Sequence, residues 1–374
     1  MSRTSLRRSR TLVTVMFSSK AAAALLLPTL FLTGCSAELT PSAKVTPAPT
    51  DVCIITDGGG LEDGGANESS YSAVKQAVVS LGVEKQQYSA RPRRTAEFLT
   101  RKLEQFVSGG CGVIVAVGTD LRAPVIRTAR ENTANRFILV DDAPYALEID
   151  SVPSNLAHIA YSVDQASALA GYLAAAASKT QVVATFGSFP TPNVLAAMHG
   201  FRAGVSRYNE DHGTDVQVLG ATDATASDWT FIRSETSTLA AYRASTGFFA
   251  ATADVIYPVA SVAGFGAGKA SLKFPGVMVI GGDRDWSTEA ATADWKQNLI
   301  ASVQKQVSQR VFQAIESALG PDFSNTEYLG TLENEGVNLT AEGSIGYPSE
   351  FTANLGRLTR DIIAGRLVTN GTGN

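Results

Sequence analysis

Histidine and cysteine are both scarce in this chain, with three of each among 374 residues. His158, His199 and His212 show none of the spacings that are typical of metal ligands, and no nucleophile motif accompanies them. We therefore expect no catalytic residues, no metal site and no cofactor. The remaining catalytic alternative is an enzyme that uses clustered Asp side chains as general acids and bases.

The cysteines leave two alternatives open. Cys53 and Cys111 each stand at the start of an apolar, strand-like run. If these strands are neighbours in a parallel sheet, the two thiols lie at the same edge, and a disulfide can form in an exported protein. Otherwise, they are two buried small apolar side chains.

An excess of basic residues is also absent. The chain has 31 Lys and Arg against 35 Asp and Glu, which gives a net charge of −4 at pH 7. Surfaces that bind nucleic acids need clustered positive charge, so we expect no nucleic-acid partner. Beyond the N-terminal segment, no apolar run is long enough to span a membrane.

The N-terminal segment predicts export and lipidation. Several arginines precede an apolar run at 21–32, which is shorter than a membrane span. The run ends in Leu-Thr-Gly-Cys, which resembles a bacterial lipobox with Cys35 as the lipidated residue. We expect a lipoprotein signal peptide at 1–34 and a lipid anchor on the extracytoplasmic face of the cell membrane. The alternative is an ordinary signal peptide followed by an incidental cysteine.

The rest of the chain divides into a tether and a large folded part. Residues 35–50, which begin with the lipidated cysteine, are rich in Pro, Thr, Ser and Ala and predict a flexible tether. About 320 residues follow, more than one ordinary core holds, so two lobes are expected. Strand-like apolar runs alternate with helical patterns; they include 52–56, 113–117, 136–140, 158–162, 182–186 and 255–259. The alternation predicts an α/β fold of parallel sheets with helices on both faces.

Acidic residues and glycines gather just after several of these runs. They are found at Asp57, 118–120, Asp141, Asp142, 187–189, 260–268 and 283–285. Parallel sheets bind ligands beyond the carboxyl ends of their strands, so these positions are candidates for a binding site. The plainer alternative is a set of ordinary strand-end turns.

The most distinctive of these turns is the loop at 56–67, T-D-G-G-G-L-E-D-G-G-A-N, which precedes a helical pattern. Such a turn can hold a ligand at a helix N-terminus. Its carboxylates, on Asp57, Glu62 and Asp63, repel phosphate but accept hydrogen bonds from hydroxyls and amines. The loop therefore predicts an uncharged, hydroxyl-bearing ligand, unless it is only a tight turn with solvated acids.

Four segments form a pattern when they are taken in order. They are the 57–67 loop, His-Gly-Phe-Arg-Ala-Gly-Val at 199–205, Ala-Asp-Val-Ile-Tyr-Pro-Val-Ala at 253–260, and Val-Ile-Gly-Gly-Asp-Arg-Asp at 279–285 with Ala-Ser-Val-Gln-Lys at 301–305. This pattern resembles the basic membrane protein family, lipid-anchored purine-nucleoside-binding proteins of bacterial ABC importers. The resemblance implies a two-lobed, type I periplasmic-binding-protein-like fold. Each lobe would be a parallel sheet flanked by helices, with the ligand cleft between the lobes.

The resemblance also implies roles for individual residues. Asp57 and Asn67 would lie on the near wall of the cleft. Asp141 or Asp142 would approach the base of the nucleoside.

The ribose would be held by Asp283 and Lys305. A carboxylate can accept both ribose hydroxyl protons, and a nearby ammonium keeps it ionised in a poorly hydrated cleft. Without the resemblance, Lys305 would be interpreted as a solvated lysine. The turn at 261–266, which includes Gly264, would also line the cleft but has fewer glycines than the family pattern.

One position departs from the family pattern. The residue before Asn67 is normally an aromatic that stacks on the purine, and here it is Ala66. Stacking contributes about 1–3 kcal/mol per base, out of roughly 8 kcal/mol for a micromolar affinity. Another ring can compensate, and we expect it to be Phe189, Trp229 or Phe265.

Together these features predict a solute-binding lipoprotein that closes two lobes around a small ligand, a purine nucleoside, and delivers it as a monomer to an ABC permease and ATPase. Lobe 1 is expected at 51–150 plus 286–330, and lobe 2 at 151–285 plus 331–374. One alternative is a lipid-anchored ligand sensor or surface lipoprotein of the same fold, with a different ligand and no transport role. An Asp-dependent nucleoside hydrolase is the other alternative.

Overall fold

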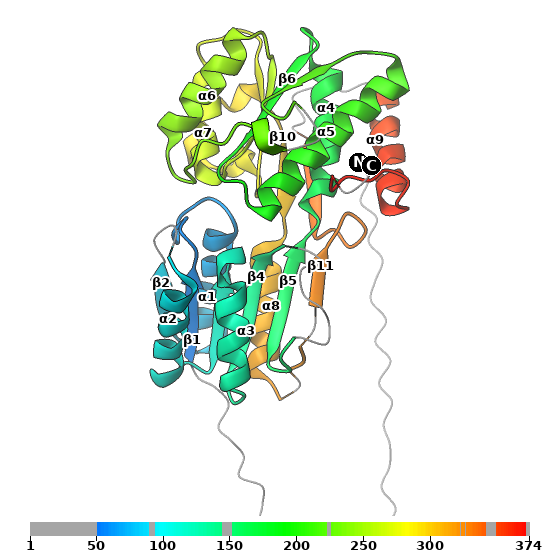
Figure 1. The fold of residues 1–374 in the computed structure, drawn as a ribbon. Coiled ribbons are helices and arrows are strands. Elements are labelled where there is room, and N and C mark those ends of the chain that lie inside the picture. Colours follow the sequence, from blue (N-terminus) through cyan, green and yellow to red (C-terminus); the bar gives the residue numbers. More distant parts are fainter. Residues whose placement is uncertain are drawn as a thin grey trace, which may run out of the picture. The chain divides into compact units, whose positions relative to one another are not determined.

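The computed structural model describes residues 51–89, 94–143, 152–222, 226–321, 323–325, 327–341 and 349–371. The expected signal peptide at 1–34, the lipidated Cys35 and the tether lie outside these residues. Within the described part, the chain forms two six-stranded sheets that belong to one compact unit, Pro47–Asn374. Figure 1 labels their main elements.

The first sheet is parallel throughout its described strands, in the order β11-β5-β4-β3-β1-β2. These strands are β1 (Asp51–Thr56), β2 (Glu84–Ser89), β3 (Val113–Val117), β4 (Arg136–Asp142), β5 (Leu156–Tyr161) and β11 (Glu327–Gly330). Its flanking helices are α1 (Ala66–Leu81), α2 (Ala96–Ser108), α3 (Arg122–Glu131) and α8 (Val307–Leu319).

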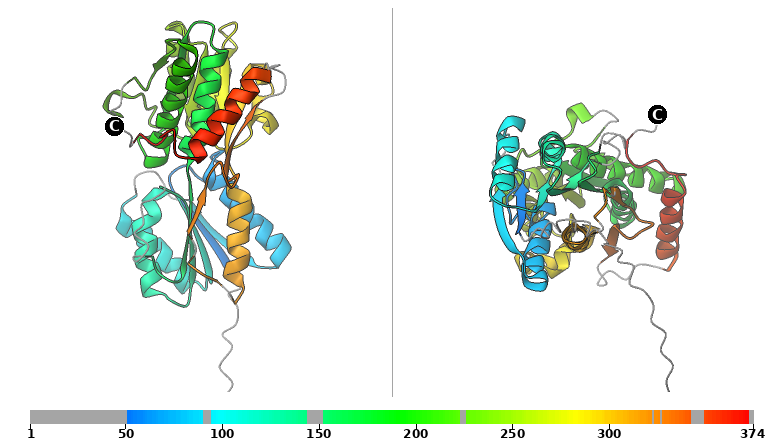
Figure 2. Two further views of the ribbon diagram at one scale, coloured as in Figure 1. Left: turned by 90° about the vertical axis from the view of Figure 1, so that its right-hand side faces the viewer. Right: turned by 90° about the horizontal axis from the view of Figure 1, so that it is seen from below.

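Side chains of the first sheet alternate between two hydrophobic clusters, as the period of a strand dictates. In β1, Val52 and Ile54 belong to the cluster with α1 and α8, whereas Cys53 and Ile55 belong to the cluster with α2 and α3. Figure 2 shows α8 and α3 on opposite faces of the sheet. Burial on both faces explains why these strands read as continuous apolar runs.

The second sheet has the order β12-β10-β9-β8-β6-β7 and is parallel except for β12, which pairs antiparallel with β10. Its strands are β6 (Val182–Gly187), β7 (Gln217–Leu219), β8 (Val255–Val259), β9 (Met278–Gly281), β10 (Leu299–Lys305) and β12 (Val337–Ala341). Its helices are α4 (Val163–Ala177), α5 (Pro192–His212), α6 (Thr238–Ala250), α7 (Phe265–Ser271) and α9 (Ser349–Ile363). Short 3₁₀ helices complete the described elements: η1 (Thr119–Leu121), η3 (Ala226–Asp228), η4 (Ser261–Gly264), η5 (Trp286–Thr288), η6 (Ala290–Thr292) and η7 (Lys296–Asn298).

The 199–205 segment forms part of a close contact between two helices. It lies in α5 and packs closely against α4. A Cβ atom at Gly200 would collide with the carbonyl of Asp164, and one at Gly204 would collide with the carbonyl of Ala168. Glycine at these two positions therefore allows the backbones of α4 and α5 to approach each other.

The expected lobe boundaries do not follow the sheets. They place the strand β5 in lobe 2, but it pairs with β4 and β11 in the first sheet. They place the strand β10 in lobe 1, but it pairs with β9 and β12 in the second. The crossings between sheets therefore follow β5, β10 and β11. Both sheets are built from equally apolar strands, so the sequence pattern of a strand does not reveal which sheet it joins.

Three strands have no clear sequence signal: β2, β11 and β12. The sequence of β2 is Glu-Lys-Gln-Gln-Tyr-Ser, and it lies at an edge of the first sheet. β11 and β12 are edge strands as well. Edge strands carry polar side chains more readily than central strands, which removes the apolar run that identifies a strand.

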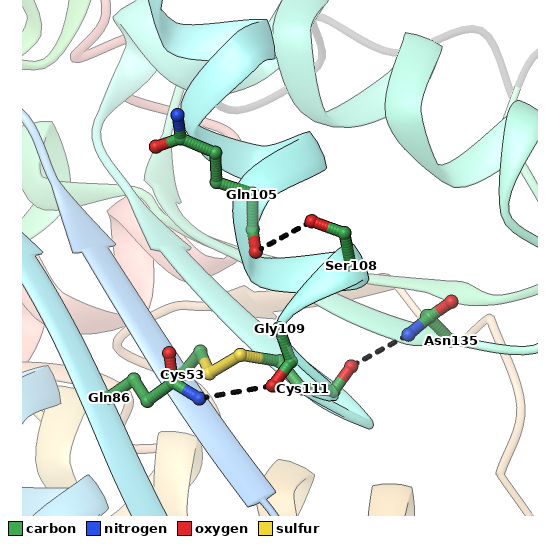
Figure 3. Close-up of a disulfide and its surroundings, with 7 residues drawn as sticks. All are labelled: Cys53, Gln86, Gln105, Ser108, Gly109, Cys111 and Asn135. Carbon is green, nitrogen blue, oxygen red and sulfur yellow. Dashed lines mark hydrogen bonds between the residues drawn. A yellow bond between two sulfur atoms is a disulfide. The ribbon is translucent and has the colours of Figure 1, made fainter.

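A disulfide joins Cys53 in β1 to Cys111, which lies just before β3 (Figure 3). The Cα atoms are 5.9 Å apart, and both residues are fully buried. Because β1 and β3 are neighbours in the sheet, the two cysteines meet at the same edge. Of the two alternatives that the sequence left open, the structure contains the disulfide.

Removal of this disulfide should destabilise the folded protein. The bond joins positions that are 58 residues apart, and closing a loop of this length contributes about 2–4 kcal/mol. We expect the double variant C53A/C111A to lose about this much unfolding free energy in urea denaturation. Cys35→Ala, which leaves the disulfide intact, is the control. Equal urea midpoints for the parent and the double variant would contradict a stabilising role.

Candidate functional site

A cavity of about 270 Å³ lies at the carboxyl ends of strands from both sheets. The ends of β1, β3 and β4 contribute from the first sheet, and those of β6, β8, β9 and β10 contribute from the second. This is the position at which parallel sheets bind ligands. The structure brings together here the expected residues Asp57, Asn67, Asp141, Phe189, Asp283 and Lys305.

The central feature of the cavity is a buried ammonium group between two carboxylates. Lys305 Nζ lies 2.9 Å from an oxygen of Asp141 and 2.9 Å from an oxygen of Asp283. Its side chain is only 6% exposed. Burial acts to lower the pKa of Lys305, but the two carboxylates outweigh it and raise the pKa, so the ammonium stays charged. Asp141 is the penultimate residue of β4 and Lys305 is the last residue of β10, so this group links the two sheets.

Unusual backbone conformations aim these carboxylates into the cavity. Asp141 has φ of 55° and Asp283 has φ of 68°, both in the left-handed region that Asp tolerates better than most residues. Asn193 Nδ2 donates to the carbonyl of Asp141 at 2.7 Å, and Lys305 N donates to the carbonyl of Asp283 at 3.0 Å. Ser261 Oγ donates to Asp283 Oδ2 at 3.1 Å. Each strained turn is therefore fixed by hydrogen bonds.

Asp57 and Asn67 are paired directly. Asn67 Nδ2 donates to Asp57 Oδ1 at 2.7 Å, and Gly59 N donates to the same oxygen at 3.2 Å. Gly118 leaves room for this carboxylate, because a Cβ atom at that position would collide with it, and its φ of 105° also favours glycine. Burial raises the pKa of Asp57, although the hydrogen bonds from Asn67 and Gly59 oppose the shift.

Three acids that line the cavity, Asp63, Asp120 and Glu235, were not among the expected site residues. Asp63 Oδ1 accepts hydrogen bonds from Gly65 N at 2.8 Å and Glu68 N at 3.1 Å, yet burial raises its pKa to about 7. Burial, together with the charge of Asp57, raises the pKa of Glu235 to about 8. Asp63 belongs to the acidic loop at 56–67, so the sequence contained a signal from which its place at the site could have been predicted. Glu235 lies in no motif, and nothing in the sequence pointed to it.

Asp142 was expected near the ligand, but it lies outside the cavity. Its carboxylate accepts two hydrogen bonds of 2.6 Å from Arg122 and lies 3.2 Å from His158 Nε2. Burial acts to raise the pKa of Asp142, but His158 and Arg122 outweigh it and lower the pKa. Asp142 is therefore a structural ion-pair residue of the first sheet, and Asp141 is the one that faces the cavity.

Two of the three rings expected to replace the missing stacking partner also lie outside the cavity. The Trp229 ring packs against His199, with ring centroids 4.5 Å apart. Phe265 packs edge-on against Trp286 at 4.8 Å. Both are buried among neighbouring apolar side chains of the second sheet. Among the expected rings, Phe189 lines the cavity.

Gly264 is the remaining expected residue that does not line the cavity. It ends η4, and a Cβ atom there would lie 2.8 Å from the Trp286 ring. Glycine at this position therefore makes room for a buried tryptophan and not for a ligand.

Acidic side chains dominate the charge of the cavity. Among its described lining residues, Lys305 is the one basic side chain, and the acids are Asp57, Asp63, Asp120, Asp141, Glu235 and Asp283. The carboxylates of Asp141 and Asp283 are paired with the ammonium. The remaining acids supply no positive charge that could hold phosphates or other anions.

The family of the chain follows from a match along most of its length. A model of the Bmp family, described as ABC transporter substrate-binding protein PnrA-like, matches residues 51–347. The chain belongs to this family. The family consists of solute-binding proteins and not of enzymes, which confirms both the resemblance seen in the sequence and the prediction that the chain is not an enzyme.

Individual relatives support the same assignment. The chain is 25% identical to Basic membrane protein D of Borreliella burgdorferi over 314 residues, which cover 83% of each protein. It is also 25% identical to the CD4+ T-cell-stimulating antigen of Listeria monocytogenes, over 77% of this chain and 79% of the relative.

Solved structures of solute-binding proteins have the same fold. An ABC transporter solute-binding protein from Aeropyrum pernix K1 matches with a TM-score of 0.70 at 18% identity, over 85% of this chain and 92% of that one. One from Conexibacter woesei matches with a TM-score of 0.63 at 22% identity, over 86% and 99% of the two chains. These matches confirm the predicted two-lobed type I fold. None of the described helices combines the length and apolar character that crossing a bilayer requires.

The raised pKa values of Asp63 and Glu235 predict how stability depends on pH. In the unfolded chain, both groups ionise near the ordinary pKa values of Asp and Glu, 3.8 and 4.5, but they stay protonated to higher pH in the folded protein. The folded state therefore holds more protons between about pH 4 and pH 8, so the unfolding free energy falls as pH rises through this window.

Glu235→Gln should flatten this pH dependence, because the amide cannot ionise. Relative to the parent, we expect the ligand-free variant to gain about 1–2 kcal/mol of unfolding free energy between pH 5 and pH 8, after screening by solvent. Urea denaturation at a series of pH values measures the difference. Glu333→Gln, at an exposed position, is the control. Parallel pH profiles for E235Q and the parent would show that Glu235 stays ionised.

Proposed function

We propose that this substrate-binding protein of the Bmp family is a lipid-anchored receptor that captures a nucleoside, or a closely related hydroxylated molecule, and delivers it to an ABC permease. The observation that carries the proposal is the buried Lys305 ammonium, which holds Asp283 at the cavity. One oxygen of Asp283 faces Lys305 and the other accepts from Ser261. A carboxylate held in this way can accept hydrogen bonds from two neighbouring hydroxyls of a ribose or sugar.

The acidity of the cavity supports a ligand without phosphate. Charge-assisted hydrogen bonds from hydroxyls to carboxylates are stronger than neutral ones. A phosphate would instead face Asp57, Asp63 and Glu235, which lie in the same cavity and offer it no positive charge. The proposal therefore covers nucleosides and excludes nucleotides.

Of the three aromatic residues expected to stack on a nucleoside base, Phe189 lines the cavity. Ala66 and Phe189 both line the cavity, and Tyr257 adds a second ring. Stacking on a single ring contributes about 1–3 kcal/mol. Polar contacts must therefore account for a larger share of the affinity than they would with an aromatic at position 66.

Contacts across the cavity support capture by closure of the two sides. Val262 N donates to the carbonyl of Asp63 at 2.8 Å, and Arg284 forms an ion pair of 2.8 Å with Glu68. Both contacts connect the β1–α1 segment to segments of the second sheet. Such contacts form only when the two sides are together, as in the hinge closure of binding proteins.

Ligand screening tests the nucleoside part of the proposal. We expect nucleosides to raise the melting temperature of the purified protein, because a ligand at 100 times its Kd adds about 2.7 kcal/mol, and we expect nucleotides to have no effect. Asp283→Ala should weaken binding by about 10-fold or more, since it removes a charged hydrogen-bond acceptor. Asp294→Ala, at an exposed position, is the control. Stabilisation by nucleotides over nucleosides, or unchanged calorimetric affinity in D283A, would overturn the assignment.

Membrane fractionation tests the anchor. If Cys35 carries the lipid, Cys35→Ala should move the protein from the membrane fraction to the soluble fraction or leave it as an unprocessed precursor. Ser36→Ala keeps the cysteine and should remain in the membrane fraction with the parent. A parent protein that is fully soluble after export would instead favour the ordinary signal peptide.

A further inference from the structure

Asn193 is a polar residue of the cavity that was not among the expected site residues. It is the second residue of α5, a helix of the second sheet, and it lines the cavity. Its Nδ2 donates to the carbonyl of Asp141 at 2.7 Å, and Asp141 lies near the end of β4 in the first sheet. The amide of Asn193 therefore connects the two sides of the cavity directly.

The other end of the same amide has no partner in the described part of the protein. A carbonyl oxygen only accepts hydrogen bonds, so the bond to Asp141 fixes which end of the amide is the nitrogen. The remaining atom, Asn193 Oδ1, is buried and receives no hydrogen bond from the residues that the structure describes. A buried acceptor without a donor is costly. Because Asn193 lines the cavity, a molecule bound there is in a position to supply the missing donor.

Asn67 offers a comparison from the first sheet. It is also the second residue of its helix, its Nδ2 donates to Asp57 at 2.7 Å, and its Oδ1 is a buried acceptor without a described donor. Asn67 and Asp57 both belong to the β1–α1 segment, so their bond does not depend on the second sheet. The bond of Asn193 spans the cavity, and it forms only when the two sides are together.

The bond across the cavity also acts on the Lys305 site. Asp141 has φ of 55°, and the bond from Asn193 holds its carbonyl in this turn. The same turn places the Asp141 carboxylate 2.9 Å from Lys305 Nζ. The position of the Asn193 amide and the geometry of the Lys305 site are therefore linked through one residue.

We propose that Asn193 is a ligand-binding residue that couples ligand binding to closure of the cavity. Its Oδ1 accepts a hydrogen bond from a hydroxyl or amino group of the ligand, while its Nδ2 donates to Asp141 on the opposite side. The ligand holds the planar amide in the orientation that the bond across the cavity requires, so binding and closure stabilise each other. This inference rests on the proposed function, because its ligand is the molecule whose hydroxyls are placed at Asp283.

Two substitutions in the full-length protein test the two ends of the amide. Asn193→Asp keeps the size and the free oxygen but at pH 8 cannot donate to Asp141, and Asn193→Ala removes both ends. The probe is whichever of adenosine, guanosine, inosine, cytidine and uridine binds the parent most tightly. In calorimetry we expect each variant to bind it about 10-fold or more weakly. At saturating probe, both variants should show a smaller decrease in radius of gyration than the parent, measured by small-angle X-ray scattering.

Measurements without ligand distinguish coupling from a purely structural role. The bond to Asp141 exists only in the closed protein, so N193D and N193A should have the melting temperature of the parent when no ligand is present. Asn67→Ala is the matched variant, since it removes a ligand acceptor from one side only. It should bind the probe more weakly but still close at saturation. Gln297→Ala, at an exposed amide that does not line the cavity, is the control for unchanged affinity and closure.

The outcomes separate this inference from the proposed function. If N193A and N193D bind the probe as tightly as the parent, the inference is overturned while the proposed function stands. Weaker binding with full closure at saturation would show that Asn193 contacts the ligand without coupling, and this also overturns the inference. So would a loss of closure in N67A equal to that in N193A, or a lower melting temperature of both Asn193 variants without ligand. If no nucleoside binds the parent, the nucleoside assignment and the inference both fall.

Discussion

The ligand site depends on one buried ammonium group. Lys305 lies between Asp141 of the first sheet and Asp283 of the second and is almost completely shielded from solvent. Such a group contributes little net stability compared with apolar packing, but loss of one partner leaves a buried charge and costs about 3–5 kcal/mol. The three side chains must therefore stay together, and this requirement couples the strand ends of the two sheets. The cavity lies at these strand ends, which the coupling holds together.

The backbone is strained at the two residues that form ion pairs with Lys305. Asp141 and Asp283 both have positive φ, a conformation that costs about 1–2 kcal/mol per residue outside glycine. The hydrogen bond from Asn193 to Asp141 and the backbone bond from Lys305 to Asp283 offset this cost. Strain of this kind gathers at functional sites, because regular strand ends would direct the carboxylates elsewhere.

The sequence predicted the parts of the site that have a local cause. Asp57 and Asp283 follow directly from strand-end loops, the family resemblance added Asn67, and the apolar runs identified most central strands of both sheets. Glu235 could not be found, because it precedes α6 in a polar segment and reaches the cavity only through tertiary packing. From the sequence, Trp229 was an equally plausible ligand residue, but in the structure its ring is buried against His199. The choice of sheet for β5 and β10 also depended on pairing between distant strands, which apolar periodicity does not encode.

The two acidic groups of the cavity differ in one respect that explains their separate roles. At Lys305 the protein supplies the cation itself, so the carboxylates of Asp141 and Asp283 are neutralised before any ligand enters and remain available to hydroxyls. Around Asp63 and Glu235 the protein supplies no cation, and burial instead raises the pKa values of both carboxyl groups, so they hold protons near neutral pH. These two groups are therefore neutral where the two sides of the cavity meet, and they can both donate and accept hydrogen bonds.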